Sequence, residues 1–157
     1  MNQIELRGVF EDLVKEYEDT IYSVCYMYGE NRPEVDDLFQ ESLINLWRGL
    51  PNFRGESNIK SWIYRISLNV CISYKRKKRI NTVPLNISAE LFDETSPKGK
   101  NNKLLHERIM KLEKFDRAII LLWLEDLSYE EIAAIVGISV KAVGVKLVRI
   151  KEKMKNL

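Results

Sequence analysis

Apolar residues recur at spacings of three and four along most of the chain, which is the pattern of helices that each bury one face. One such stripe covers residues 10–28 and stops at residues 29–33, where Gly, Asn and Pro favour a turn. Two further stripes cover residues 35–47 and 59–74. The pattern therefore predicts three amphipathic helices that can pack against one another as a compact bundle.

The periodic pattern is lost at residues 81–103, where Asn, Pro, Ser, Gly and Lys predominate, and a linker is expected there. Helical spacing then returns at residues 104–112, 119–124, 128–136 and 140–155. No segment shows the alternation typical of a strand. The sequence thus predicts an all-α protein with two small helical domains, residues 1–80 and 104–157, joined by the linker.

A helix-turn-helix pattern is the strongest local signal in the second domain. Ala133 supplies the small residue where the two helices meet, Gly137 tolerates a positive φ in the turn, and Val143 supplies a branched residue for the inner face. The second helix is expected to expose the cations Lys141, Lys146, Arg149, Lys151 and Lys153. An ordinary helical hairpin is the alternative, but capping, turn and charge together favour binding to duplex DNA.

The formal net charge of +2 conceals blocks of opposite sign. Residues 1–41 hold three basic and eleven acidic residues, a net of −8, whereas residues 42–80 hold nine basic and one acidic, a net of +8. Residues 104–131 carry a net of −3 and residues 132–157 a net of +5. The two basic blocks are candidate nucleic-acid surfaces, although charge runs can also simply solvate a helix.

Aromatic residues accompany the cations of the first basic block. Cations that follow a backbone beside rings that stack on bases are typical of single-strand binding. Trp62 and Tyr74 lie on the apolar stripe and are expected in the core, so Phe53 is the stronger candidate for a base contact. The candidate backbone contacts are Arg54, Lys60, Arg65, Lys75 and Arg76.

The second helix carries an acidic and polar set, Asp36, Asp37, Gln40 and Glu41, which is expected to share one face. Such a face can be merely solvated, can hold a metal ion for phosphoryl chemistry, or can dock a protein. No third metal ligand and no phosphate-binding Gly loop accompany it, which disfavours the metal site.

Other function classes are disfavoured by composition. One histidine and two separated cysteines, Cys25 and Cys71, make a zinc centre or a catalytic triad improbable, and both cysteines are expected to be buried thiols. No apolar run approaches the roughly 18 residues of a membrane span, and the N-terminus lacks the pattern of a signal peptide. The two thiols are expected in a reducing compartment, and metalloenzymes are nearly excluded.

Specific runs in both halves resemble a known family. In the first half, DDLFQE (36–41), LWR (46–48), FRGES (53–57) and WIYRISLN (62–69) resemble region 2 of the extracytoplasmic-function (ECF) sigma factors of the sigma-70 family. In the second half, LSYEEIA (127–133) and GIS (137–139) resemble region 4 of that family. The resemblance implies a cytoplasmic promoter-specificity factor that directs promoter recognition, −10 melting and transcription initiation by RNA polymerase. Such a factor needs no cofactor or metal and has no enzymatic activity of its own.

The resemblance also implies roles for particular residues. The acidic helix would dock on the clamp helices of the largest polymerase subunit through Asp37, Gln40 and Glu41. A pocket for one flipped base of the −10 element would contain Phe53, Ile66 and Asn69. The helix-turn-helix would recognise the −35 element through Lys141, Gly144, Lys146 and Arg149.

The recognition helix departs from the family. The family commonly has Thr, Lys and Ser where this chain has Ala142, Gly144 and Val145, so the resemblance does not predict the −35 base preference. An anti-sigma factor is a further implied partner. The alternatives are a free-standing helix-turn-helix regulator that dimerises through residues 1–80, and a metal-dependent nucleic-acid enzyme.

Overall fold

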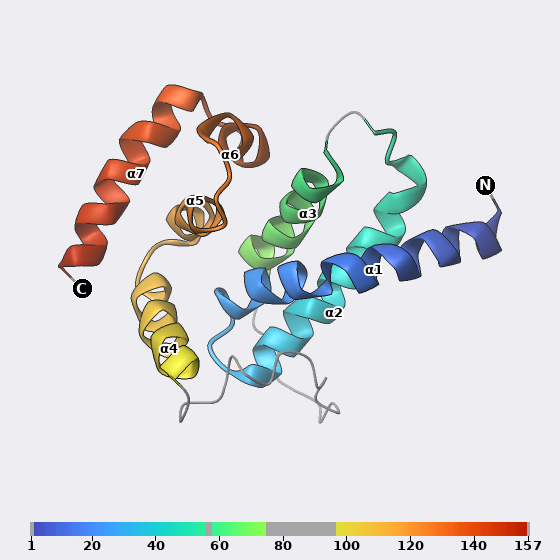
Figure 1. The fold of residues 1–157 in the computed structure, drawn as a ribbon, viewed down its shortest axis with the longest axis horizontal. Coiled ribbons are helices and arrows are strands. Elements are labelled where there is room, and N and C mark those ends of the chain that lie inside the picture. The colour runs from blue at the N-terminus through green and yellow to red at the C-terminus, as the bar shows by residue number, and fades with distance from the viewer. Residues whose placement is uncertain (1, 56–57, 75–96, 157) are drawn as a thin grey trace. The chain divides into compact units, whose positions relative to one another are not determined.

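The computed structural model describes residues 2–55, 58–74 and 97–156, with side chains described from residue 103 onward in the last segment (Figure 1). The chain divides into two units, Met1–Ile87 and Ser88–Leu157. All regular elements of the described segments are helices, so the predicted all-helical class and the two helical groups are confirmed.

Unit 1 contains α1 (Gln3–Tyr26), α2 (Arg32–Gly49) and α3 (Ile59–Ser73), with a short 3-10 helix, η1 (Leu50–Asn52), after α2. Each of the three α-helices contacts the other two. All three begin in the same way, because an asparagine side chain accepts a hydrogen bond from a backbone N–H of the first turn. These caps are Asn2, Asn31 and Asn58.

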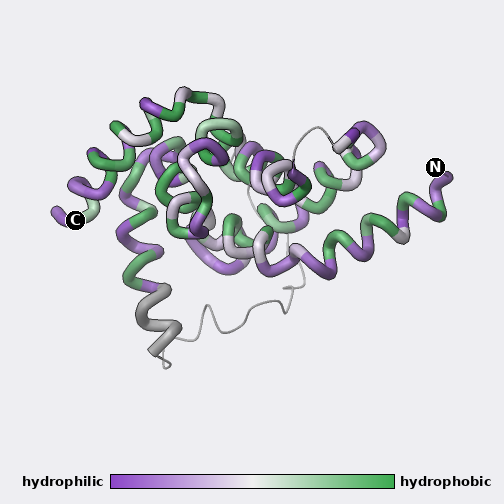
Figure 2. The backbone as a smooth tube through the Cα atoms, turned by 45° about the horizontal axis from the view of Figure 1, so that its top comes forward, coloured by the Kyte–Doolittle hydropathy of each residue, from purple (hydrophilic) through white to green (hydrophobic). Residues whose placement is uncertain are grey.

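The core of unit 1 forms from the apolar stripes of the three helices. In Figure 2, hydrophobic residues recur along the described helices with hydrophilic residues between them. Tyr22 of α1 meets Phe39 of α2 edge to face, with ring centroids 5.6 Å apart. At the turn between these helices, a Cβ on Gly29 would lie 2.9 Å from the backbone nitrogen of Val35, so glycine permits the close approach of the two chain segments.

Unit 2 contains α4 (Pro97–Met110), α5 (Lys114–Leu124), α6 (Tyr129–Val136) and α7 (Val140–Lys155). The helices α5, α6 and α7 contact one another. Helix α4 begins at Pro97, seven residues before the expected start at Leu104. Proline is compatible with a first helical turn because its missing N–H would have no intrahelical partner there. The remainder of the predicted linker, residues 81–96, lies outside the described residues.

The turn between α6 and α7 has the predicted helix-turn-helix geometry. Gly137 adopts a left-handed conformation, φ 79°, and its N–H donates to the Ala133 carbonyl at 2.9 Å. The Ser139 side chain then accepts from the Ala142 N–H at 3.1 Å and caps α7. Val143 is completely buried on the inner face. The small residue, the positive φ and the cap therefore act together to fix the angle between the two helices.

Ser128 and Glu131 form a reciprocal capping box at the start of α6. The Ser128 Oγ accepts from the Glu131 N–H, and the Glu131 carboxylate accepts from the Ser128 N–H, both at 3.1 Å. We expect Ser128→Ala to lower the free energy of unfolding of unit 2 by about 1 kcal/mol, because one donor loses its acceptor. Ser128→Asn, which keeps a capping side chain, should stay near the parent protein in thermal or urea denaturation. Equal losses in both variants would contradict this role.

None of the described helices is both long enough and apolar enough to cross a membrane.

Candidate nucleic-acid interface

Asp36 does not belong to the exposed face of α2 where the sequence pattern placed it. Its side chain is buried, with 3% of the residue exposed, and Tyr22 Oη of α1 donates to Asp36 Oδ1 at 3.4 Å. Burial and the nearby Asp36 carboxylate raise the pKa of Tyr22 to about 12, so this hydroxyl keeps its proton and remains a donor. The prediction of one four-residue polar face was wrong because α1 packs on the side of α2 that carries Asp36, which the sequence pattern of α2 does not reveal.

The three predicted docking residues do share a side of α2. Gln40 is exposed and both Asp37 and Glu41 are half-buried, at spacings of three and four that bring them together. Asp37 Oδ2 accepts a hydrogen bond from Tyr74 Oη, which follows α3, at 3.4 Å. Asp37 thus belongs to the acidic side of α2 and is also tied to the end of α3.

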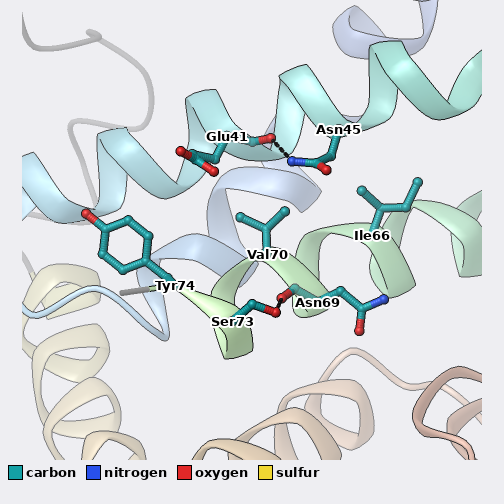
Figure 3. A pocket seen from close by; sticks show the side chains of 7 residues that line it. All are labelled: Glu41, Asn45, Ile66, Asn69, Val70, Ser73 and Tyr74. Carbon is teal, nitrogen blue, oxygen red and sulfur yellow. Dashed lines mark hydrogen bonds between the residues drawn. The ribbon is translucent and has the colours of Figure 1, made fainter. Parts of the chain in front are cut away.

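A groove lies between α2 and α3 in unit 1. Figure 3 shows its lining, which consists of Glu41 and Asn45 from α2 and of Ile66, Asn69, Val70, Ser73 and Tyr74 from α3 and the residue after it. Val70 points toward α2, whereas the Asn69 residue is exposed. The groove therefore brings together Ile66 and Asn69, two of the three predicted base-contacting residues, and places Glu41 of the docking set on the opposite wall.

Two side chains of the groove bond to the backbone one turn earlier. Asn45 Nδ2 donates to the Glu41 carbonyl at 2.8 Å, and Ser73 Oγ donates to the Asn69 carbonyl at 2.6 Å (Figure 3). The latter bond uses the backbone of Asn69 and not its amide side chain. Sequence reasoning missed Asn45, although its position four residues after Glu41 indicates the same side of α2.

Phe53 lies apart from the lining of this groove. It follows η1 and packs against Trp62 of α3, with ring centroids 4.8 Å apart and planes inclined by 35°. Trp62 also lies near the end of α2, because a Cβ on Gly49 would be 3.2 Å from Trp62 Cζ2 and 3.6 Å from Ile66 Cδ1. The structure thus brings Ile66 and Asn69 to one groove and places Phe53 against the neighbouring Trp62.

The cations of the first basic block are distributed around α3. Arg54 and Lys60 are exposed and Arg65 is half-buried. Lys60 Nζ lies 6.0 Å from the centroid of the Tyr64 ring, at the outer limit of a cation–π contact. The remaining two candidates, Lys75 and Arg76, lie outside the described residues.

The cations of α7 differ in their surroundings. Lys141 and Arg149 are exposed, whereas Lys146 is half-buried with its Nζ 5.5 Å from the Phe115 ring centroid of α5. Lys151 Nζ lies 3.8 Å from the Trp123 ring centroid, and Lys153 Nζ lies 3.6 Å from Asp116 Oδ2. Lys141, Arg149 and Lys153 are thus exposed as predicted. The prediction was wrong for Lys146 and Lys151, which are half-buried because their ammonium groups lie over aromatic rings of α5.

Gly144 of α7 lies beside Tyr129, the first residue of α6. A Cβ at this glycine would be 3.6 Å from Tyr129 Cε2, an ordinary van der Waals distance. Gly144 is half-buried. Its neighbour on this side of α7 is therefore an aromatic ring of α6, and the position itself adds no side chain to the solvent face.

Metal-ligating and thiol groups do not gather in the described part of the chain. Within the described segments, no group of three or more His, Cys, Asp or Glu residues could hold a metal ion. Cys25 and Cys71 are free thiols and are buried, as predicted.

Comparison with known families agrees with the two units. Residues 13–80 match the family model described as Sigma-70 region 2, and residues 102–154 match that described as Sigma-70, region 4. The matches together cover more than half of the chain. The chain therefore belongs to the sigma-70 family, as an ECF sigma factor that directs transcription initiation by RNA polymerase and has no catalytic role of its own.

Curated relatives match over nearly the whole chain. The ECF RNA polymerase sigma-E factor of Haemophilus influenzae is 30% identical over 166 residues, covering 96% of this chain and 87% of the relative. The sigma-E factor of Salmonella typhimurium is 32% identical over 164 residues, covering 94% and 85%. The ECF sigma factor SigW of Bacillus subtilis is 28% identical over 166 residues, covering 96% and 89%.

Two solved structures share the fold. CnrH, solved in complex with the cytosolic domain of CnrY, superposes with a TM-score of 0.71 at 24% identity and covers 96% of this chain and 87% of its own. The sigma factor RpoE of Bartonella quintana, solved with the anti-sigma factor NepR, gives a TM-score of 0.64 at 18% identity and covers 94% of each chain.

Proposed function

We propose that unit 1 joins the core polymerase to the −10 element and that unit 2 recognises the −35 element. In this proposal residues 1–80 act as the region 2 domain, residues 104–157 as the region 4 domain, and residues 81–103 as their connection. The observation that carries the proposal is the groove of unit 1, since a docking candidate, Glu41, and the base-contacting candidates Ile66 and Asn69 line it together.

The docking surface is the side of α2 that carries Asp37, Gln40 and Glu41. Two carboxylates and an amide in adjacent turns suit a basic surface, which the resemblance identifies as the clamp helices of the largest polymerase subunit. The burial of Asp36 supports this assignment indirectly, because its carboxylate accepts a hydrogen bond from Tyr22 in the core. Asp37 and Glu41 are thus the carboxylates of this set that a partner can reach.

The −10 site has three parts. Asn69 would form hydrogen bonds to the polar edge of one extruded base, Ile66 would contact its face, and Phe53 would contribute stacking from beside Trp62. Cations of the first basic block would bind the phosphates that flank this base. They are Arg54, Lys60, Arg65, Lys75 and Arg76.

The −35 site is the solvent face of α7, whose N-terminal turns would lie in the major groove. Arg149 and Lys141 are exposed and would contact phosphates or base edges, while Lys146 would reach a phosphate from beside Phe115. Gly144 leaves room beside Tyr129 at the same surface.

One experiment tests the proposal as a whole. The purified chain is added to core RNA polymerase, and run-off transcripts are sequenced from a library of random promoters. We expect transcripts that start downstream of a shared pair of elements and that depend on the added chain. Sequence-specific duplex binding without polymerase, together with no gain in specific transcription, would instead support a free-standing regulator.

We further propose that a protein inhibitor of the anti-sigma class controls this sigma factor in the cytoplasm. CnrH was solved with the cytosolic domain of CnrY, and RpoE of Bartonella quintana was solved with the anti-sigma factor NepR. The test is to purify the chain from cells and to look for a protein that co-purifies with it and blocks its binding to core polymerase. Removal of that protein should restore core binding.

Substitutions in α7 separate the two DNA sites. Arg149→Ala and Lys146→Ala should each weaken −35-dependent promoter binding several-fold. Each should also reduce the slope of the logarithm of the binding constant against log salt by about 0.9, because each removes one phosphate contact. Lys111→Ala, an exposed cation of the same unit outside α7, is the matched control and should leave the slope unchanged. Binding of holoenzyme to a promoter fragment that carries only the −10 element should be unaffected by all three changes. A loss on that fragment would show that the units do not act separately.

A further inference from the structure

Helix α7 exposes its first residue, Val140, and two further valines on the side opposite the core of unit 2. Val145 is 44% exposed and Val148 is 64% exposed, although branched apolar residues usually favour the interior. The opposite face of the helix carries the buried residues Val143, Leu147 and Ile150, each at most 1% exposed. Val145 and Val148 are thus directed away from the core of unit 2.

These valines share a stripe with two of the exposed cations of α7. Val145 lies four residues after Lys141, three before Val148 and four before Arg149, and these spacings gather the four residues on one side of the helix. The next residue of this stripe is Glu152, which is exposed and would be repelled by phosphates. The part of α7 suited to DNA therefore ends before Glu152, and apolar side chains occupy its centre.

Among the groups that base pairs present in the major groove, the thymine methyl is the apolar one. Two aliphatic side chains between Lys141 and Arg149 have no polar atoms with which to distinguish the donors and acceptors of other bases. We propose that Val145 and Val148 contact thymine 5-methyl groups in the −35 duplex, so that this chain selects thymine at one or two −35 positions by the methyl group. This inference rests on the proposed −35 role of α7.

Charge favours DNA as the occupant of this surface. The valines lie between two cations in a segment of net charge +5, residues 132–157, and a polyanion neutralises both cations while its methyl groups cover the valines. The competing occupant is a protein partner that covers the stripe. In that case, removal of thymine methyl groups from the −35 duplex would not affect promoter binding.

The test removes only the methyl group from the DNA. Promoters are first selected by transcription with the full-length chain and core polymerase, and each thymine of the −35 duplex is then replaced by deoxyuridine. We expect an about fourfold loss of promoter binding at one or two positions, corresponding to one buried methyl group. At those positions Val145→Ala or Val148→Ala should make thymine and uracil equivalent. Val9→Ala, which truncates a similarly exposed valine of α1, should preserve the uracil effect.

The outcomes are distinguishable. Specific transcription with no sensitivity to uracil at any −35 position would overturn the inference and leave the proposed function standing. The inference would also be overturned if both alanine variants kept the uracil effect. If those variants lost binding of a protein partner while the uracil effect persisted, the stripe would be the docking site of that protein instead. Failure of the chain to direct any specific transcript would contradict the proposed function itself, and the inference with it.

Discussion

Reversal of charge at Asp37 and Glu41, in the double variant Asp37→Lys, Glu41→Lys, is expected to weaken binding of core RNA polymerase about a hundredfold. The two carboxylates lie one turn apart on the same side of α2, so both would meet the same basic surface. Replacing attraction with repulsion at a docking surface costs several kcal/mol, which corresponds to this order of loss. The measurement is the core affinity at several salt concentrations, and the loss should be greatest at low to moderate salt.

Two matched controls isolate docking from stability and from net charge. Tyr74→Phe removes the hydrogen bond that Asp37 Oδ2 accepts and should leave core affinity nearly unchanged. Asp12→Lys, Glu16→Lys makes the same change in charge at two exposed positions of α1 with the same spacing. If this α1 variant lost as much affinity as the α2 variant, the effect would come from overall charge, and the assigned docking surface would be wrong.

Asn69→Ala is expected to reduce the base preference at one −10 position about tenfold, because one amide that forms two hydrogen bonds to a base edge supplies discrimination of that order. The substitution should not destabilise unit 1. The hydrogen bond from Ser73 uses the Asn69 carbonyl, which alanine retains, and alanine is the better helix former at an exposed position. Transcription from four promoters that differ only in this base, together with permanganate footprinting of the open region, provides the measurement.

Asn45→Ala is the matched control for Asn69, because it removes the amide on the other wall of the groove, which donates to the Glu41 carbonyl. Base preference should persist in this variant. Phe53→Ala should slow promoter opening whatever base occupies the position, since stacking does not depend on the polar edge. If Asn69→Ala lowered transcription from all four promoters equally, Asn69 would serve the fold and not base recognition.

The helices, though not the start of α4, could be predicted from the sequence because their causes are local. The capping box needs only Ser128 and Glu131 at a spacing of three, and the turn between α6 and α7 needs only a residue such as Gly137 that tolerates a positive φ. The pairing of Ile66 with Asn69 on one side of α3 likewise follows from their spacing. The family itself was predicted from short runs in a fixed order, and the family matches confirm it.

The surroundings of individual side chains depended on residues far away in the sequence. Asp36 and Asp37 are neighbours on α2, yet one binds Tyr22 on α1 and the other Tyr74 after α3. Periodicity states which residues of one helix share a side, but not which helix covers that side or where its edge falls. The assignment of Asp36 to the exposed face failed for this reason.

The same reason explains two further differences. Lys146 Nζ lies 5.5 Å from the ring centroid of Phe115, thirty-one positions earlier in the chain, because α7 packs on α5. Phe53 packs against Trp62 because the turn after α2 returns the chain to α3. The sequence alone therefore determined the helices, the turn of the helix-turn-helix, the family and the candidate residues. Only the packing of the helices decided which of those residues meet in the groove, which are committed to the core, and which of the α7 side chains remain exposed.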